Sequence, residues 1–366
     1  MAIRKHLSNI GATFLKRVYR KRRNGMGVKH MTRLCMLAVI LLALFGCRGA
    51  SDDGEKNQCD MTPTGRVELP KDDGRHSDEP MEWWYWTGHL KTAEGRWFGF
   101  ETTFFAVELI PGQAGQMVHF AITDIDAGTF HHDAQFSTEP ALAVENGFQF
   151  AISPHTAIGG DGRDQLHGEV DDYVLDVSME PIKPAVLQHG DGFTEYDVGG
   201  YTYYYSRERM AAVGTIGVAG ETFEVTGTAW FDHQWGELSQ VANTGWDWFA
   251  LQLDDSTEMM IYILRPKSGD VSLGGSFTDA DCQTTEIGQE ELEVTSLGEW
   301  TSPHTGCTYP SGWTIVFGGQ SHTLTPVLED QEMYSVGPAP RYWEGAAIVS
   351  GDETGRAYIE LVGYCD

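Results

Sequence analysis

The stretch FDHQWG, residues 231–236, places a carboxyl group, an imidazole and an indole within four positions. A carboxylic acid in an apolar pocket has a raised pKa and stays protonated near neutral pH, so Asp232 is a candidate proton donor. His233 could activate an attacking water, and the ring face of Trp235 could stabilise a carbocation. Together they suit the addition of water to an isolated carbon–carbon double bond. The competing interpretation is that Asp232 and His233 form a buried hydrogen bond that fixes the segment between two domains.

A second aromatic cluster, EWWYWTGHL, spans residues 82–90. On a strand, Trp84 and Trp86 share one face and Trp83 and Tyr85 share the other, and only one face of a barrel strand looks inward. We predict that Trp84 and Trp86 contact the ligand. The alternative for each is a purely structural role. Glu82 is predicted either as the partner of an indole N–H or as a catalytic carboxylate.

Further candidate ligand contacts lie elsewhere in the chain. Trp246 and Trp248 follow the first motif closely in TGWDWFALQL, residues 244–253. His119 lies on the face opposite Val118 and Phe120, so it either points into a cavity or is a hydrogen-bonded core histidine.

Several chemistries are disfavoured. The cluster FHHD, residues 130–133, resembles a loop, but adjacent histidines on an extended chain point in opposite directions, and no third ligand is suitably spaced, so no metal site is predicted. The sequence has no G-x-S-x-G elbow, which disfavours a serine hydrolase. It also has no P-loop and no G-x-G-x-x-G in a suitable context, and no cofactor is expected.

The elements that must position these residues are strands. From residue 82 onward, short alternating runs are separated by Gly, Asp and Asn, which is typical of an all-β barrel or sandwich. A hairpin turn is expected at residues 91–95, with Gly95 available for positive φ. Strands are predicted in the following segments: 82–90, 96–105, 116–125, 147–153, 173–181, 201–218 and 221–231.

A weak internal repeat suggests two domains. Trp-x-Trp at residues 84–86 recurs at 246–248, and Glu-[Val/Leu]-x-Gly at 224–227 recurs at 360–363, in the same order. We therefore predict two tandem antiparallel barrels, residues 76–238 and 239–366, each of a size that can hold one small ligand.

The N-terminal segment resembles an export signal. Basic residues precede a short apolar run that ends in LFGC at residues 44–47, similar to a bacterial lipobox. We predict a lipoprotein signal over residues 1–47, membrane anchoring through lipidated Cys47, and a flexible tether over residues 48–75. Met26 and Met31 are alternative start sites. The expected location is the periplasmic side of a bacterial envelope, anchored to the outer membrane.

Charge and cysteine content agree with an exported protein. The first 47 residues hold ten Lys or Arg and no Asp or Glu, which leaves 15 basic and 53 acidic residues, a formal charge of −38. Nucleic acid is therefore a poor partner. Four cysteines remain, and in an oxidising compartment they are expected to form disulfides, with Cys282–Cys307 and Cys59–Cys365 the favoured pairs.

A family resemblance extends over residues 75–364. The segments EWWYWTG, HFAITD, FDHQWG, GWDWFALQLDD and YWEGAAIVSG with YIELVGY are similar, in this order, to the carotenoid hydratase and AttH-like group of lipocalin-like proteins. The resemblance implies two calycin barrels in tandem with a ligand site near their junction. Some members hydrate a double bond in a long polyene, others are encoded beside ABC-transporter components, and many are described only as secreted hydrolases.

The resemblance also bears on individual residues. It implies roles for His233 and Trp235, and for a Tyr/Asp pair on the strand after the second Trp-x-Trp. That strand, EMMIYILRP, holds Tyr262 but no following aspartate, which weakens the hydratase interpretation. Trp343, in the last motif, is a further candidate ligand contact.

Three functions follow. In the first, the chain is expected to bind a large apolar molecule, such as a polyene, terpenoid or lipid, and to hydrate, isomerise or cyclise it; hydration of an isolated double bond, as by carotenoid hydratases, is the most specific prediction. Alternatively, it is a non-catalytic lipid-binding accessory lipoprotein of an ABC transporter. A surface adhesin or structural lipoprotein is the third possibility and needs no pocket. If neither Asp232 nor His233 opens into a cavity, the enzymatic interpretation fails.

Overall fold

The computed structural model describes residues 59, 62–110, 113–242, 244–267, 269–337 and 341–365. They belong to one compact unit, Glu55–Asp366. The predicted signal, its Cys47 and residues 48–58 and 60–61 of the predicted tether lie outside the described residues. Residues 62–75 of that segment are packed against the first barrel, where Asp73 is buried and forms an ion pair of 2.8 Å with Arg207. Among the described residues, no helix has the length and apolar character needed to cross a bilayer.

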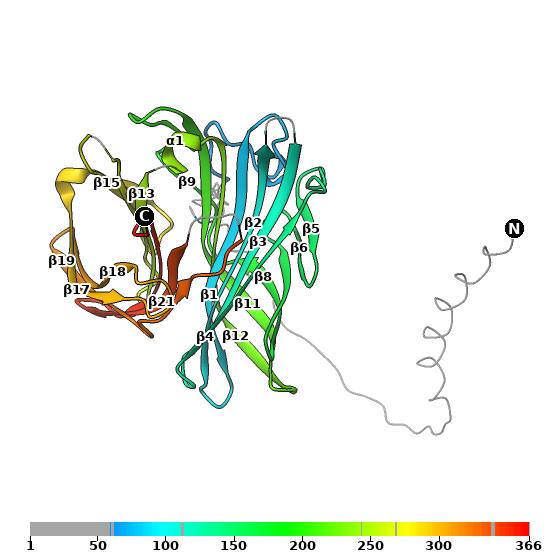
Figure 1. Cartoon of the computed structure of the whole chain (residues 1–366). Coiled ribbons are helices and arrows are strands. Elements are labelled where there is room, and N and C mark those ends of the chain that lie inside the picture. The colour runs from blue at the N-terminus through cyan, green and yellow to red at the C-terminus, as the bar shows by residue number, and fades with distance from the viewer. Residues whose placement is uncertain are drawn as a thin grey trace, which may run out of the picture. The chain divides into compact units, whose positions relative to one another are not determined.

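The first sheet contains twelve antiparallel strands, in the order β4-β3-β2-β1-β12-β11-β8-β7-β6-β5, with β9 and β10 paired to β11. It forms the blue-to-green barrel of Figure 1. Its strands are β1 (Met81–Thr92), β2 (Trp97–Ile110), β3 (Gln113–Asp124), β4 (Thr129–Ser137), β5 (Phe148–Ile152), β6 (His155–Gly159), β7 (Asp164–Val170), β8 (Tyr173–Pro181), β9 (Val186–Leu187), β10 (Phe193–Glu195), β11 (Tyr201–Val218) and β12 (Glu221–Glu237).

The second sheet contains ten antiparallel strands, in the order β16-β15-β14-β13-β22-β21-β19-β18-β17, with β20 paired to β21. It is the yellow-to-red barrel of Figure 1. Its strands are β13 (Gly245–Leu253), β14 (Glu258–Arg265), β15 (Ser272–Thr278), β16 (Thr284–Ile287), β17 (Leu292–Thr301), β18 (Thr308–Phe317), β19 (Gln320–Pro326), β20 (Glu332–Met333), β21 (Tyr342–Gly351) and β22 (Gly355–Val362). The expected all-β fold with two tandem lipocalin-like barrels is confirmed.

Helical structure is minor in the described residues. The α-helix α1 (Ser239–Ala242) lies in the connection between the sheets, and two 3-10 turns, η2 (Lys71–Asp73) and η3 (Gln289–Glu291), complete the elements. Two local expectations were wrong. The strand predicted at 221–231 is longer than expected, because β12 continues through residues 232–236 to Glu237. Residues 130–133 lie within β4 rather than in a loop.

The interior of the first barrel is filled with side chains. Trp84 and Trp86 are fully buried there with Phe98, Phe100 and Phe104. Burying each such ring contributes roughly 1.5–3 kcal/mol, so this interior is a stabilising core rather than a ligand cavity. The second barrel has its own core around Phe249, Leu251 and Trp313.

The two sheets share one connectivity, since the first strand of each pairs with both the second and the last strand. The repeated sequence motifs are nevertheless not equivalent in space. Trp84 and Trp86 face a barrel interior, whereas Trp246 and Trp248 point out of theirs, toward the first barrel. The structural counterparts of Trp246 and Trp248 are therefore the outward-facing residues of β1.

The outer faces of the two sheets pack against each other. At one point the approach requires a glycine, because a Cβ on Gly99 would lie 2.9 Å from the Cβ of Ala346. At another, Lys183 forms an ion pair of 2.6 Å with Glu258 of the second barrel, and Arg209 forms a second ion pair with the same carboxylate. The barrels are thus joined by both apolar and ionic contacts.

Two disulfides are present, and both differ from the favoured pairing. Cys59 pairs with Cys282, and Cys307 pairs with Cys365. Closure of the second barrel carries the end of the chain back to Tyr309, whose hydroxyl lies 3.5 Å from Cys365 Sγ. Closeness in sequence between Cys282 and Cys307 therefore did not indicate closeness in space.

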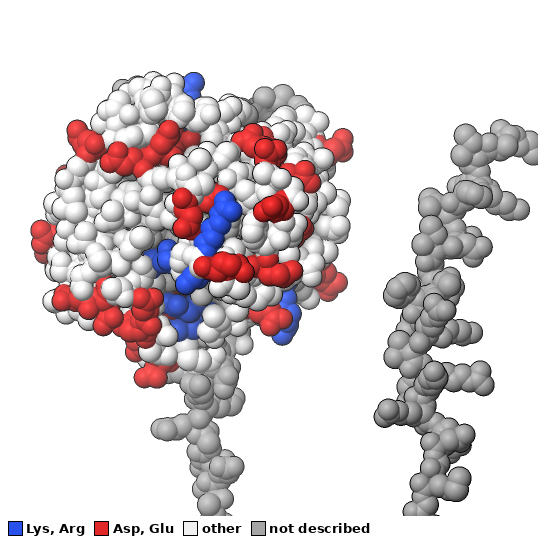
Figure 2. Space-filling model, turned by 90° about the horizontal axis from the view of Figure 1, so that it is seen from below, with Lys and Arg blue, Asp and Glu red and all other residues white. Residues whose placement is uncertain are grey.

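The charged surface follows the composition. On the face drawn in Figure 2, acidic side chains are scattered over much of the surface, whereas Lys and Arg side chains are few and gather mainly near the middle.

Candidate functional site

A cavity of about 400 Å³ lies between the outer faces of the two barrels. Both sheets contribute side chains at every second position, as strand alternation requires. None of the residues that line it is Lys or Arg, and most are aromatic or aliphatic. The principal lining residues are Trp83, Tyr85, Phe105, His119, Tyr204, Asp232, Trp246, Trp248, Tyr262, Leu264 and Glu360.

Asp232 is the carboxyl that β12 presents to this cavity. It is 3 % exposed, and its partners are all neutral donors. The Tyr204 hydroxyl donates to Oδ2 at 2.5 Å, and the Ser206 hydroxyl and the Trp230 indole N–H donate to Oδ1 at 2.5 and 2.7 Å. Burial raises the pKa of Asp232 to about 6, although the three hydrogen bonds oppose that rise. The group can therefore exchange a proton near neutral pH.

A hydrogen-bonded chain links this carboxyl to the opposite barrel. The Trp248 indole N–H donates to the Tyr204 hydroxyl at 3.2 Å, and Tyr204 donates to Asp232. Trp248 also makes edge contacts with Tyr85 and Trp230, at ring-centroid distances of 5.2 and 5.9 Å. The rings around Asp232 are thus fixed by contacts from both sheets.

Glu360 is a second cavity carboxyl, supplied by β22. The Trp246 indole N–H donates to Glu360 Oε2 at 3.0 Å. Burial raises the pKa of Glu360 to about 7. The cavity therefore holds two carboxyl groups, one from each barrel, without a cation among its lining residues.

His119 contributes an imidazole. Its Nδ1 shares a hydrogen bond of 2.8 Å with the Tyr342 hydroxyl, and its Nε2 is buried without a partner among the described residues. Burial lowers the pKa of His119 to about 3, so the ring is neutral at physiological pH. It is a lining residue of the cavity and not a core histidine.

The AttH-like family model matches residues 60–364, nearly the whole described chain. The chain belongs to the AttH-like family. A crystal structure assigned as an AttH from Nitrosomonas europaea is 30 % identical, with a TM-score of 0.75 over 84 % of this chain and 99 % of that one. Kievitone hydratase from Nectria haematococca shares the fold at 18 % identity, with a TM-score of 0.68 over 85 % of this chain and 98 % of that one. A search of curated proteins found no match.

The structure of this AttH-like chain divides the sequence candidates into two groups. Five of them line the inter-barrel cavity, namely His119, Asp232, Trp246, Trp248 and Tyr262. Six lie elsewhere: Glu82, Trp84, Trp86, His233 and Trp235 in or at the end of the first barrel, and Trp343 in the core of the second. Trp343 donates its indole N–H to the backbone oxygen of Glu329 at 2.7 Å.

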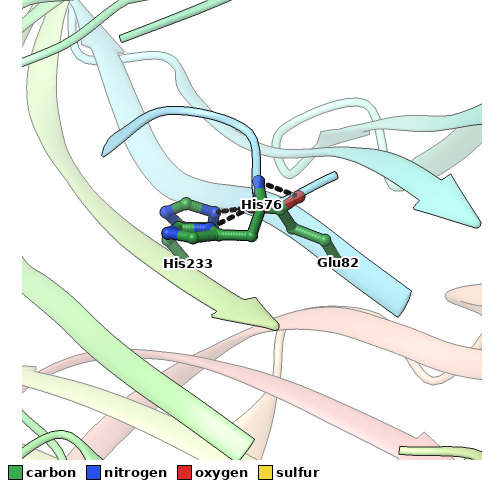
Figure 3. A group of neighbouring side chains, drawn as sticks. All are labelled: His76, Glu82 and His233. Carbon is green, nitrogen blue, oxygen red and sulfur yellow. Dashed lines mark hydrogen bonds and ion pairs between the residues drawn. The ribbon is translucent and has the colours of Figure 1, made fainter. Parts of the chain in front are cut away.

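Asp232 and His233 do not form the pair suggested by the sequence, because neighbours on a strand point to opposite faces. His233 lies inside the first barrel, where Nε2 is 2.9 Å from Glu82 Oε1. His76 Nδ1 lies 2.7 Å from the same oxygen, as Figure 3 shows, and Arg75 forms an ion pair of 2.7 Å with the other oxygen. Burial opposes ionisation of Glu82, but its hydrogen bonds with His233 and His76 lower its pKa to about 2.

Glu82 is therefore not the partner of either indole in the first Trp-x-Trp. Trp84 donates to the backbone oxygen of Asp73 at 3.1 Å, and Trp86 donates to Asp164 at 3.0 Å. Trp235 stacks on His76 with a centroid distance of 3.9 Å.

The cluster of His76, Glu82 and His233 offers ligand atoms within 4.8 Å of one another, the spacing of a metal site. Its chemistry favours an ionic cluster instead. Both imidazoles hydrogen-bond to Oε1 of Glu82, and the Arg75 guanidinium forms an ion pair with Oε2. The guanidinium thus supplies the positive charge that a metal ion would bring.

Several lining residues escaped the sequence analysis. Glu360 was noted only as part of the repeated Glu-Leu-x-Gly motif, and Tyr85 only as a neighbour of tryptophans. The signal for Glu360 was its alternation with apolar positions in YIELVGY, where Tyr358, Glu360 and Val362 share a face. A carboxyl group on an otherwise apolar strand face marks a buried acid.

Proposed function

We propose that this AttH-like chain binds an apolar molecule in the inter-barrel cavity and adds water to, or removes water from, a carbon–carbon double bond. The observation that carries the proposal is the Asp232 carboxyl, buried among aromatic rings with neutral donors only. Hydration of an unactivated alkene requires a proton on carbon and then stabilisation of the resulting cation. The cavity carboxyls, Asp232 and Glu360, both titrate near neutral pH and can supply that proton, and the faces of Trp248 and Tyr85 can stabilise the cation.

The ligand class follows from the lining. Rings and aliphatic chains favour a largely apolar molecule such as an isoprenoid or lipid. The unpartnered Nε2 of His119 and the hydroxyl of Tyr262 are polar atoms that could bind the hydroxyl group of an alcohol product. The shared fold with an enzyme named as a hydratase is consistent with this proposal, as a likeness of fold only.

The test uses a phenol that carries one dimethylallyl group, incubated with the protein in isotopically labelled water, with mass spectrometry of the product. We expect a tertiary alcohol containing oxygen from the solvent, formed by the native chain and lost in Asp232→Asn. Loss in His233→Gln with retention in Asp232→Asn would move the reaction to the Glu82 cluster.

A second function, binding without chemistry, is favoured by one observation. The strand β14, which carries Tyr262, has no aspartate, and Leu264 extends its apolar cavity face. A chain that binds the dimethylallyl phenol without converting it would support a lipid-binding accessory role, such as that of a transporter lipoprotein.

We propose further that the chain is exported and anchored through lipidated Cys47. The disulfides Cys59–Cys282 and Cys307–Cys365 support an oxidising compartment. Metabolic labelling with a palmitate analogue in a bacterial host tests this proposal, with Cys47→Ala as the control.

A further inference from the structure

A row of four side chains crosses the second sheet beside the cavity. In the strand register, Trp248 of β13 is opposite Tyr262 of β14 on one side and opposite Glu360 of β22 on the other. Glu360 is in turn directly opposite Glu344 of β21. Two carboxyl groups thus sit side by side on one sheet face, which is unfavourable when both are charged.

A third carboxyl group approaches this pair from the first barrel. Glu101 and Glu344 are fully buried, Glu360 is half-buried at the cavity, and none of them has an ion pair in the described part of the chain. The Tyr85 hydroxyl donates to Glu344 Oε1 at 2.8 Å, and the Thr103 hydroxyl donates to Glu101. Oε2 of both Glu101 and Glu344 is buried and has no hydrogen-bond partner within the part of the chain that the structure describes. Burial and mutual repulsion keep protons on this cluster.

The cavity carboxyls differ in how they are hydrogen-bonded. Asp232 accepts three hydrogen bonds from neutral donors, which stabilise a negative charge. Glu360 accepts one, from Trp246, and has Glu344 beside it. The same cavity therefore favours an ionised Asp232 and a protonated Glu360.

The titratable groups around Glu360 come from both barrels, and all are neutral or acidic. They are Tyr85 of β1, Glu101 of β2, His119 of β3, His189 and Tyr196, which flank β10, Tyr204 of β11, Asp232 of β12, Tyr262 of β14, Tyr342 and Glu344 of β21, and Tyr358 of β22.

We infer that Glu360 donates the proton and Asp232 accepts one, with Glu344 positioned to hold Glu360 in its protonated form; the inference rests on the proposed function. The alkene π pair takes the proton of the Glu360 carboxyl and forms a C–H bond, leaving a tertiary carbocation and a Glu360 carboxylate. Water oxygen then bonds to the cationic carbon and loses a proton to the Asp232 carboxylate. One water is added, and a proton returned from Asp232 to Glu360 through solvent resets the site.

The roles are separated by deuterium exchange in heavy water with the dimethylallyl phenol. In Asp232→Asn, Glu360 can still transfer a deuteron to the alkene, and the cation can lose a proton to give the alkene again. Alcohol formation therefore falls about 10²–10⁴-fold, while deuterium enters the recovered alkene. In Glu360→Gln both alcohol formation and exchange fall by that factor. The control is Glu224→Gln, which changes an exposed glutamate in the Glu-Val-x-Gly motif of the first barrel. It should leave alcohol formation and deuterium exchange unchanged. Exchange that persists in Glu360→Gln and disappears in Asp232→Asn would overturn the assignment.

An infrared measurement tests the assignment without turnover. At about pH 6.5, Glu360→Gln should remove more carboxylic acid C=O absorption than Asp232→Asn does, and Asp232→Asn should remove more carboxylate absorption than Glu360→Gln does. A larger loss of acid absorption in Asp232→Asn, or no loss in either variant, contradicts the inference. If the native chain does not convert the phenol, that result counts against the proposed function. The infrared bands would still show whether Glu360 is protonated and Asp232 is ionised.

Discussion

Asp232 and His233 are consecutive residues of β12, yet their side chains lie on opposite faces of the first sheet. Asp232 lines the cavity between the barrels, and His233 hydrogen-bonds to Glu82 inside the first barrel at 2.9 Å. One face of the strand therefore serves the candidate chemistry, and the other serves the stability of the fold.

This division predicts different outcomes for two conservative substitutions. Asp232→Asn keeps the shape and removes a titrating group, so the rate should fall about 10²–10⁴-fold, and the unfolding free energy should change little at about pH 4, where the folded-state carboxyl of the native chain is protonated. Steady-state kinetics and urea unfolding measure the two effects. Asp172→Asn, an exposed change on the same barrel, is the control and should alter neither. A fully active Asp232→Asn variant would remove Asp232 from the chemistry.

Glu82 gives a pH-dependent prediction for stability. Because its folded pKa is lowered from 4.5 to about 2, the ionised form contributes stability above pH 4.5 that is lost as the pH falls toward 2. The contribution is about 3 kcal/mol. Glu82→Gln should therefore lower the unfolding free energy at pH 7, and the deficit should shrink between about pH 4.5 and 2. Urea unfolding across this range checks it, and a deficit that does not change with pH would contradict the ionic role.

Glu360 should behave in the opposite way. Its folded pKa is raised from 4.5 to about 7, so its stability contribution is complete below pH 4.5 and is lost as the pH rises through 7. Glu360→Gln should be neutral for stability at about pH 4 and more stable than the native chain at about pH 8, by about 3 kcal/mol at most. Chemical unfolding of both proteins at the two pH values measures this difference. Equal unfolding free energies of Glu360→Gln and the native chain at pH 8 would mean that Glu360 ionises without cost to stability.

Trp248 should govern ligand affinity. Its ring lines the cavity and is 7 % exposed, and truncation to alanine removes a large apolar contact surface. Trp248→Ala should weaken binding of the fluorescent polyene parinaric acid at least about tenfold, which corresponds to about 1.4 kcal/mol. Trp300→Ala, a partly exposed ring of the second barrel outside the cavity lining, should bind the probe like the native chain. Equal affinities for the two variants would place the ligand elsewhere.

Much of the fold could be predicted from the sequence because each β-strand gives a local pattern of alternating residue types. Alternation at residues 96–105 and 201–218 indicated strands that the structure contains, and the turn before β2 has Gly95 at φ 98°. It was harder to predict which face of each strand points into its own barrel and which points outward. Alternation fixes which residues share a face but not whether that face meets a core or a neighbouring barrel, so Trp84 and Trp86 could not be distinguished from Trp83 and Tyr85.

The site was less predictable because it is made by packing between barrels. Asp232 and Glu360 come from opposite sheets, and no local pattern connects them. The pairing of Cys307 with Cys365 depends in the same way on how the second barrel closes. The adjacency of Asp232 and His233 was misleading, since alternation separates neighbours on a strand.

The location of the ligand is tested most directly by diffraction from crystals soaked with a brominated isoprenoid, using the anomalous signal of bromine. We expect a bromine peak between the barrels, bordered by Trp248, Asp232 and Glu360. A peak inside the first barrel near Trp84, in crystals of a protein that binds the same compound in solution, would contradict it.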